Sequence, residues 1–584
     1  MIVDPTGWTL ADFAAAYRSG ESVTTVIEAT LALLADAPDA VLISAPLRER
    51  ALADAAALDA GGPDDATDAA ARPLFGVPFV VKDNIDVAHH PTTAGCPGYE
   101  YVAAADATVV ALLRSAGAVV VGKTNLDQFA TGLVGTRSPY GSPLNTLDPG
   151  LVPGGSSSGS AVSVALGLVP FALGTDTAGS GRVPAALNGI VGIKPTLGRV
   201  STYGIVPAMR RFDCPSVFAR NVADAETIAT TLSVLDRRDP FMPTPLSPSR
   251  FHDRPVVGVP ATWPERVELS DEMARRFDES VAALAGLGCE IVSVDIEPLL
   301  DVGALLYGSA LVAERSAAVG EAVDKGVAGL DPVVATIIGR GNEISAVDAY
   351  RTEYELTLLR ATCGEIWNGI DVLALPTTPQ PATREEVDRD PFGRNEMLGR
   401  LTTFVNLLDL AAIVVPMRPR SDAVPAGLQL IAPAWQDSEL ARLAQSFESG
   451  ALVSAPQHEC TVVVVGAHLR GLPLHHQLTD RRATFGGAAR TSADYRLYAL
   501  AGTVPAKPGL VRCAPGDGAE IEVELWSMGP AEFGSFVDGV PAPLSIGTIA
   551  LSDGRSYKGF LCEPIGLAGA TDITSFGGWR AYLA

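Results

Sequence analysis

The sequence is poor in cysteine, histidine and positive charge, and each shortage excludes a class of function. Seven cysteines are scattered without CxxC spacing, and neither His-x-His nor His-plus-carboxylate spacing occurs, so we expect no metal site and no disulfide framework. The 43 lysines and arginines are outnumbered by 67 acidic residues, which gives a formal net charge of -24. This charge argues against nucleic acids and anionic membranes as partners.

Long apolar runs are also missing. No stretch reaches the roughly 20 uninterrupted apolar residues that a membrane-spanning helix needs. The first residues, MIVDPTGWTLADF, lack the basic and apolar regions of a signal peptide. We therefore expect a cytoplasmic protein with no membrane partner. Because 47% of its 584 residues are hydrophobic, the chain can bury large cores, and its length favours more than one domain.

Two clusters of glycine and small hydroxyl residues mark a candidate active site. Residues 154–159 read GGSSSG and residues 175–181 read TDTAGSG. The small-residue segment 160–169 between them predicts a helix that ends near Pro170. Glycines at such positions let backbone N–H groups turn inward toward a ligand.

The periodicity of the first third of the chain alternates between helix and strand. It predicts helices over 10–17, 23–35 and 107–115, and strands over 118–121 and in the apolar run that ends at Lys82. Residues 61–72, GGPDDATDAAAR, predict a polar surface loop. This alternation is typical of an α/β domain with a mixed or parallel sheet.

Two sequence motifs in this region are misleading. Residues 117–124, GAVVVGKT, match the phosphate-loop pattern GxxxxGK[ST], but their variable positions are themselves a predicted strand and cannot cradle a phosphate. Residues 155–159 match GxSxG with Ser157 at the centre. That elbow needs a strand before it and a histidine after it, whereas Pro153-Gly154 precedes it and only His252 follows within the first 450 residues. A Ser-His-Asp hydrolase therefore fits poorly.

A lysine is the obvious base if a serine acts without histidine. An ordinary lysine has a pKa of about 10.4 and must be shifted down by roughly 3 units to accept a proton near neutrality, most readily by burial. The apolar run before Lys82 supplies such burial, and strand alternation would point the adjacent Asp83 elsewhere. The alternative is that Lys82 lies at the surface, with only the aliphatic part of its side chain buried and its ammonium group in water.

Three segments resemble the amidase signature family: KDNIDV from residue 82, the stretch 154–196, and AGLQLIAP at 426–433. The resemblance implies an α/β fold in which helices cover both faces of a mixed β-sheet, and a site that uses no cofactor. It further implies Ser180 as the nucleophile that attacks an amide carbonyl, Ser156 as a relay held by a cis peptide bond, and Lys82 as the base.

The loop before the nucleophile would stabilise negative charge on the substrate. The backbone N–H groups of Thr177, Ala178 and Gly179, with that of Ser180 itself, would form the oxyanion hole. Asp176 and Arg182, six residues apart, could pair to brace this loop or form a structural ion pair.

Segments 122–145 and 402–416, together with a C-terminal extension, resemble the allophanate hydrolase branch of this family. In that branch a tyrosine and an arginine hold the carboxylate of a small anionic amide, which implies these roles for Tyr307 and Arg315 and a backbone contact from Gly132. Their spacing of eight predicts that Tyr307 and Arg315 share a face of one helix. Without the resemblance, Arg315 would be assigned to a surface salt bridge with Glu314 or Glu321, and Tyr307 to the core.

The implied activity is hydrolysis of the terminal amide of allophanate, giving ammonia and carbon dioxide. The resemblance also implies coupling to an enzyme that makes allophanate, either a urea carboxylase or an enzyme of cyanuric acid or biuret breakdown. A broad-specificity amidase, a non-enzymatic scaffold and a glutamine-dependent amidotransferase subunit remain as alternatives.

The sequence predicts two domains, 1–450 and 460–584, with a linker at 451–459. Short strands and hairpin turns in the second resemble the small α+β, γ-glutamylcyclotransferase-like fold, with Asp553-Gly554 as one turn. The resemblance implies that His476 lines a pocket there. This domain would either act on the carboxylated product or provide dimer contacts and solubility, and the family resemblance suggests a homodimer.

Overall fold

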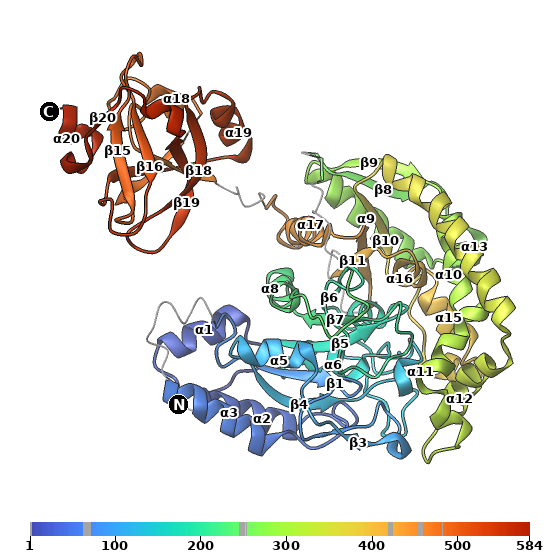
Figure 1. Ribbon diagram of the computed structural model, residues 1–584. Helices are drawn as coiled ribbons and strands as arrows, with labels where there is room; N and C mark the ends of the chain where they lie inside the picture. Colours follow the sequence, from blue (N-terminus) through green and yellow to red (C-terminus); the bar gives the residue numbers. More distant parts are fainter. Residues whose placement is uncertain are drawn as a thin grey trace. The chain divides into compact units, whose positions relative to one another are not determined.

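The computed structural model describes residues 3–61, 72–243, 251–252, 254–417, 424–453, 460–481 and 483–583. The chain forms two compact units, Met1–Val453 and Ser454–Ala584 (Figure 1). Most of the predicted loop 61–72 lies outside the described residues. Within the described ranges, no helix combines the length and the apolar character needed to cross a membrane.

A ten-stranded mixed sheet forms the centre of the larger unit. Its spatial order is β4 (Val119–Thr124), β1 (Pro78–Lys82), β5 (Phe171–Asp176), β7 (Cys214–Ala219), β6 (Val191–Lys194), β11 (Ala411–Pro416), β12 (Gly427–Ala432), β10 (Val372–Pro376), β8 (Val256–Pro260) and β9 (Glu290–Val294). The first three strands are parallel, as are the last three, and the pairs between them are antiparallel.

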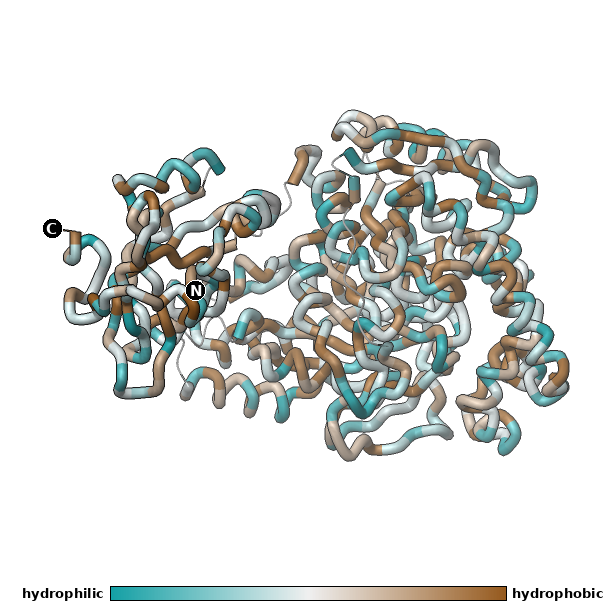
Figure 2. The backbone as a smooth tube through the Cα atoms, turned by 45° about the horizontal axis from the view of Figure 1, so that its top comes forward, coloured by the Kyte–Doolittle hydropathy of each residue, from teal (hydrophilic) through white to brown (hydrophobic). Residues whose placement is uncertain are grey.

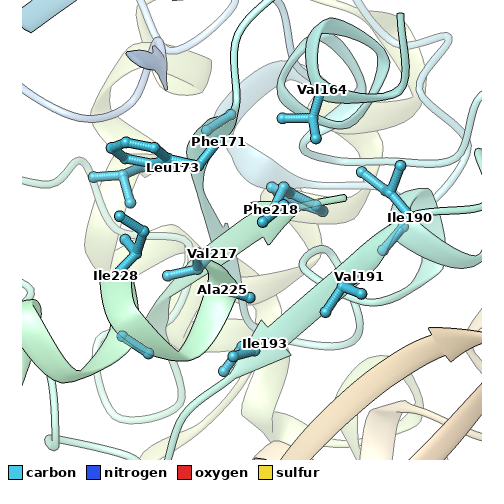
Figure 3. Packing of buried hydrophobic residues seen from close by; sticks show 14 of the residues in the cluster. Val164, Phe171, Leu173, Ile190, Val191, Ile193, Val217, Phe218, Ala225 and Ile228 are labelled. Carbon is cyan, nitrogen blue, oxygen red and sulfur yellow. The ribbon is translucent and has the colours of Figure 1, made fainter. Parts of the chain in front are cut away.

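The central strands are buried on both faces, as their near-continuous apolar sequences predict. Helices α5 (Thr108–Ser115), α8 (Val222–Leu232) and α17 (Asp437–Ser449) contact one another in series, and α6 (Ser158–Ala165) packs against α7 (Val183–Leu187). Figure 3 shows Phe171, Val217, Phe218 and Ile193 among the side chains of this core, and Figure 2 shows the apolar segments inside the unit. The predicted α/β class with a helix-covered mixed sheet is confirmed.

Local signals set the helix boundaries near the N-terminus. The helices are α1 (Leu10–Arg18), α2 (Val23–Ala35) and α3 (Arg48–Gly61). Ser22 caps α2 by accepting a hydrogen bond from the N–H of Thr25. The predicted spans 10–17 and 23–35 are therefore confirmed to within one residue.

A layer of helices follows β9 and carries one wall of the site described below. It consists of α10 (Glu297–Gly308), the 3₁₀ turn η4 (Ala310–Val312), α11 (Ala313–Asp324), α12 (Pro332–Gly339) and α13 (Ala346–Gly364). Shorter helices α14 (Arg384–Arg389), α15 (Gly393–Gly399) and α16 (Thr403–Leu407) lie between β10 and β11 in the chain. Helices α10 and α16 pack against each other, which connects the layer to the segment before β11.

The smaller unit contains two sheets around its own apolar core. The five-stranded sheet has the order β14 (Thr484–Arg490), β17 (Glu522–Met528), β13 (Cys460–Val464), β19 (Ser556–Cys562) and β18 (Leu544–Ala550). The three-stranded sheet is β16 (Pro508–Arg512), β15 (Tyr495–Ala499) and β20 (Thr571–Asp572). Gly554 has φ +87° in the β18–β19 hairpin, so the predicted turn at Asp553-Gly554 is confirmed.

The segment that matches the phosphate-loop pattern forms a buried strand, as its apolar central residues predict. Gly122 and Lys123 lie within β4. Lys123 forms a buried ion pair with Asp83 at 3.0 Å and donates a hydrogen bond to the carbonyl of Ile85 at 2.7 Å. The lysine therefore stabilises the fold and does not face a phosphate.

We expect Lys123→Met to destabilise the protein by about 3–5 kcal/mol, because it leaves the buried Asp83 carboxylate without its counter-ion. Thermal unfolding followed by circular dichroism measures the effect. The exposed pair of Lys325 and Glu321 provides a matched control, since Lys325→Met removes an ion pair already in water. Stabilisation of the wild type by Mg-ATP would contradict the structural role.

Candidate active site

Lys82 and Ser156 meet at the carboxyl ends of β1 and β5. The two strands are parallel neighbours, so their ends lie at the same edge of the sheet. The Lys82 Nζ donates hydrogen bonds to Ser156 Oγ at 2.7 Å and to Thr175 Oγ1 at 2.8 Å. The sequence reasoning did not single out Thr175, although it stands in the TDTAGSG cluster.

Burial controls the protonation of Lys82. The side chain is fully buried, and this desolvation lowers its pKa to about 7, against the opposing attraction of the carboxylates of Asp127, Asp213 and Asp176. Asp83 instead points away and pairs with Lys123, as strand alternation predicts. Lys82 can therefore be neutral at a pH at which an ordinary lysine is charged.

A tightly packed loop holds Ser156. The peptide bond between Gly155 and Ser156 is cis, and the carbonyl of Ser156 accepts a hydrogen bond from the N–H of Asp127 at 3.0 Å. The Asp127 carboxylate in turn accepts hydrogen bonds from the N–H groups of Gly135 and Arg137. A Cβ atom at position 155 would overlap this carboxylate, so the close approach requires glycine there. Asp127 was missed because it lies outside both glycine clusters.

Ser180 lies in the loop after β5 and is almost fully buried. Its hydroxyl is 3.5 Å from the carbonyl oxygen of Gly132. Among the residues that the structure describes, no hydrogen bond joins Ser156 to Ser180. The structure thus brings Lys82 and Ser156 into contact and places Ser180 beside Gly132, while the second link of the expected relay is not formed.

Arg182 braces the nucleophile loop from inside the protein. All five of its N–H groups donate hydrogen bonds: two to the carboxylate oxygens of Asp176, and one each to Thr402 O, Gln429 Oε1 and Asn406 Oδ1. Although burial alone would raise the pKa of Asp176, the Arg182 guanidinium lowers it. The pairing expected from sequence is present, and its three further partners come from more than 200 residues away along the chain.

The expected oxyanion donors differ in their availability. The N–H of Gly179 donates to the Asp176 carboxylate at 3.0 Å, so it is already engaged within the loop. A carboxylate is a strong acceptor and holds this N–H away from a substrate. The expectation for Gly179 is therefore not met in this structure. The backbone N–H groups of Thr177, Ala178 and Ser180 remain as candidates, and the Thr177 hydroxyl is held by Asp213 at 2.6 Å.

Tyr307 and Arg315 meet, but not on one helix as predicted. Tyr307 lies near the end of α10 and Arg315 lies in α11, with Ser309 extended between them and its hydroxyl accepting a hydrogen bond from the N–H of Leu311. This side-chain bond offers the backbone an alternative to continued helix. The Arg315 guanidinium lies 5.2 Å from the centre of the Tyr307 ring and donates to Tyr307 Oη at 3.4 Å.

Arg315 is buried without an acidic partner among the described residues. It donates to Thr131 Oγ1 at 2.9 Å, and its Nε has no hydrogen-bond partner. Glu314 pairs instead with Arg211, and Glu321 pairs with Lys325, so the surface salt bridge that the sequence left open is excluded. The Arg315 charge opposes the rise in the pKa of the buried Asp213 carboxyl that burial causes, but the two groups form no ion pair. A buried cation without a directly paired carboxylate is costly, and an anionic ligand would compensate it.

The smaller unit contains a cavity of about 260 Å³ that His468 lines and His476 does not. His476 is exposed, and its Nδ1 is 3.0 Å from the carbonyl oxygen of Pro473, so the structure places it outside this cavity and its predicted pocket role stays a prediction. His468 stacks on Phe560 with ring centres 5.0 Å apart, and burial lowers its pKa. No metal-binding cluster of histidine, cysteine or acidic residues occurs in the described ranges.

Sequence comparisons identify both units. The amidase family matches residues 25–441, and the allophanate hydrolase C-terminal domain matches residues 460–584. A urea amidolyase from Lachancea kluyveri is 42% identical over 544 residues, which cover 88% of this chain and 30% of that protein. The chain thus spans about a third of the length of the urea amidolyases that it matches.

Solved structures agree with this assignment. An allophanate hydrolase from Kluyveromyces lactis is 39% identical and covers 99% of both chains with a TM-score of 0.75. A glutamyl-tRNA(Gln) amidotransferase chain from Thermotoga maritima is 30% identical and covers 65% of this chain and 84% of its own length, with a TM-score of 0.55. The chain therefore belongs to the amidase family and carries an allophanate hydrolase C-terminal domain.

Proposed function

We propose that the chain hydrolyses allophanate, a small linear amide that carries a carboxylate at its other end. The observation that carries this proposal is the buried guanidinium of Arg315, which forms no ion pair among the described residues and is connected to the nucleophile through Thr131 and Gly132. Arg315 contacts the hydroxyl of Thr131, and the carbonyl of the next residue, Gly132, contacts Ser180. A short molecule can therefore place its carboxylate at Arg315 and its amide at Ser180.

The first step forms an acyl-enzyme. Rotation of a serine hydroxyl forms the hydrogen bond between Ser180 and Ser156. Neutral Lys82 then accepts the proton of Ser156 while Ser156 accepts the proton of Ser180. The Ser180 oxygen forms a bond to the amide carbon, and the carbonyl oxygen becomes an oxyanion beside the N–H groups of the loop. The relay returns the proton to the leaving nitrogen, the C–N bond breaks and ammonia departs.

The second step restores the enzyme. Water attacks the acyl carbon, gives a proton through Ser156 to Lys82, and displaces Ser180, which is reprotonated by the same route. The released product has a carboxylate where the amide was. Loss of carbon dioxide from this carboxylated amine gives the expected final products, ammonia and carbon dioxide.

An amidase or an amidotransferase subunit of the same family is the alternative function. Its basis is the similarity to glutamyl-tRNA(Gln) amidotransferase subunits, which reaches 35% identity over 423 residues in the Synechococcus protein. A simple neutral amide would leave Arg315 without an anionic partner, so Arg315 favours allophanate over such a substrate. Glutamine carries a carboxylate as well, and against that substrate the proposal is supported by the match of residues 460–584 to the allophanate hydrolase C-terminal domain. The match to urea amidolyases also supports functional coupling to an enzyme that produces allophanate.

A homodimer is further proposed from an exposed apolar row on α13. Val347, Tyr350, Tyr354 and Leu358 are 58–71% exposed, and their spacings of three, four and four place them along one helix face. A second copy related by a two-fold axis near Tyr354 would place Tyr350 of one helix against Leu358 of the other. The same symmetry sets Asp348 against Arg360, which are of opposite charge.

We expect Ser180→Ala to reduce ammonia release from allophanate to background and Ser156→Ala to lower kcat by about 10²–10⁴-fold, as for loss of a proton relay. Ser157→Ala is the matched control, because this neighbouring buried serine bonds the carbonyl of Thr175 and not Lys82. Equal losses in the Ser156 and Ser157 variants would contradict the relay.

The pH profile tests the role of Lys82 as base. Because Lys82 must be neutral and its pKa is lowered to about 7, log kcat/KM is expected to rise with pH and level off above about pH 7. Below that pH the lysine is protonated and cannot accept a proton. A rate independent of pH from 5 to 9, with chemistry rate-limiting, would rule out this base.

Arg315→Gln is expected to raise KM for allophanate by about 10- to 100-fold, because a bidentate charged contact is lost. Activity on a neutral amide such as propionamide should not fall. Initial rates of ammonia release with both substrates measure this difference. An unchanged rate with allophanate would favour the general amidase instead.

Light scattering of the purified protein tests the dimer. We expect Tyr354→Asp to shift the mass from dimer to monomer, because it buries a charge at the centre of the apolar row. Leu144→Asp is the control, since Leu144 is an isolated exposed apolar residue, 49% exposed. A monomeric wild type, or a dimeric Tyr354 variant, would contradict the proposed surface.

A further inference from the structure

A cavity of about 390 Å³ adjoins the outer side of the proposed carboxylate clamp. Four arginines contribute to its wall together with Tyr307 and Asn395: Arg137, Arg266, Arg340 and Arg400. The triad residues do not line it. The cavity is therefore a separate space in a chain whose overall charge is -24.

The four arginines differ in their carboxylate partners. Arg400 pairs with Glu396, which also lines the cavity, at 3.1 Å, and Arg266 pairs with Glu297 at 2.7 Å and with Asp301 at 2.8 Å. Within the described residues, neither Arg137 nor Arg340 has a carboxylate within ion-pair distance, although the Arg137 charge opposes the rise in the pKa of Asp127 that burial causes. A concave surface with an excess of positive charge concentrates small anions from solution, even when the rest of the protein is acidic.

The cavity and the clamp are joined through single residues. Arg137 donates to the carbonyl of Thr131 at 3.1 Å, and Arg315 donates to the hydroxyl of the same residue at 2.9 Å. Tyr307 lines the cavity while its hydroxyl contacts Arg315. On the other side, Asn395 Oδ1 accepts a hydrogen bond from the N–H of Leu133, next to Gly132. The cavity thus borders the clamp directly, because Tyr307 belongs to both.

The size of the cavity and the exposure of its arginines suit a transient site. At about 30 Å³ for each water molecule, the cavity has room for a small carboxylate with part of its hydration shell. Arg137 is 3% exposed and is fixed by two carbonyl oxygens, those of Thr131 and Pro391, whereas Arg340 is exposed and lies 5.8 Å from the centre of the Phe392 ring. A buried, hydrogen-bonded cation and an exposed one fit capture of an anion followed by transfer inward.

We propose that this cavity is an anion-binding antechamber, which collects small linear carboxylates before they reach the clamp at Arg315. The inference rests on the proposed function, because it assigns the entry route of the same anionic substrate. Arg340 binds the carboxylate at the rim of the cavity, and Arg137 provides positive charge at the inner end of the cavity. The antechamber raises the local substrate concentration without contacting the reacting atoms.

Arg340→Gln tests the proposal while leaving the clamp and triad intact. At low ionic strength we expect kcat/KM for allophanate to fall roughly three- to tenfold with kcat unchanged, and the difference to vanish near 0.5 M salt, where charge interactions are screened within a few ångströms. The rate with neutral propionamide should not change. Arg48→Gln is the matched control: Arg48 is 60% exposed, lies outside the cavity lining and is 4.0 Å from Glu28.

Binding of oxamate, a small amide with a carboxylate, provides a readout that does not depend on turnover. Calorimetric titration should show weaker binding to Arg340→Gln than to Arg48→Gln at low salt. Equal binding to both variants, or a kinetic loss that is the same for propionamide and at high salt, would overturn the antechamber. If the wild type releases no ammonia from allophanate, the proposed function fails, while the oxamate titration still decides the antechamber.

Discussion

The candidate site depends on keeping one lysine neutral inside the protein. Burial lowers the pKa of Lys82 to about 7 even though Asp127, Asp176 and Asp213 lie close enough to oppose that shift. The conflict is reduced because all three carboxylates are occupied elsewhere: Asp176 by Arg182, Asp127 by backbone N–H groups, and Asp213 by the Thr177 hydroxyl and backbone N–H groups. Desolvation thus outweighs attraction, and the lysine faces two hydroxyl groups that accept its hydrogen bonds.

Both loops that hold the serines are supported from distant parts of the chain. Asp127, just after β4, supports the Ser156 loop, and Arg182 ties the Ser180 loop to the segment near residue 402 and to β12. Every N–H of Arg182 has an acceptor, so this buried cation is fully satisfied. Arg315 is the contrast, since it is equally buried but has no carboxylate partner among the described residues. That contrast supports the proposed ligand-binding role of Arg315.

Sequence reasoning was most accurate where a local pattern carries the information. The apolar strand ending at Lys82, the cap at Ser22 and the strand nature of GAVVVGKT follow from periodicity and from residue chemistry, and the structure confirms all three. It was less accurate where two segments had to be placed relative to each other. Tyr307 and Arg315 were assigned to one helix because a spacing of eight fits it, yet Ser309 separates them. His476 was chosen over His468, although it is His468 that lies in a cavity.

The sequence by itself determined the α/β class, the family resemblance and, through the motifs that carry that resemblance, the candidate residues Lys82, Ser156 and Ser180, because apolar runs and short motifs are local properties of the chain. Only the tertiary structure decided that Lys82 contacts Ser156, that Gly179 turns its N–H toward Asp176, and that Arg315 lacks an acidic partner. Protonation, donor availability and charge compensation depend on which distant groups share a buried volume. Spacing along one chain does not specify those neighbours.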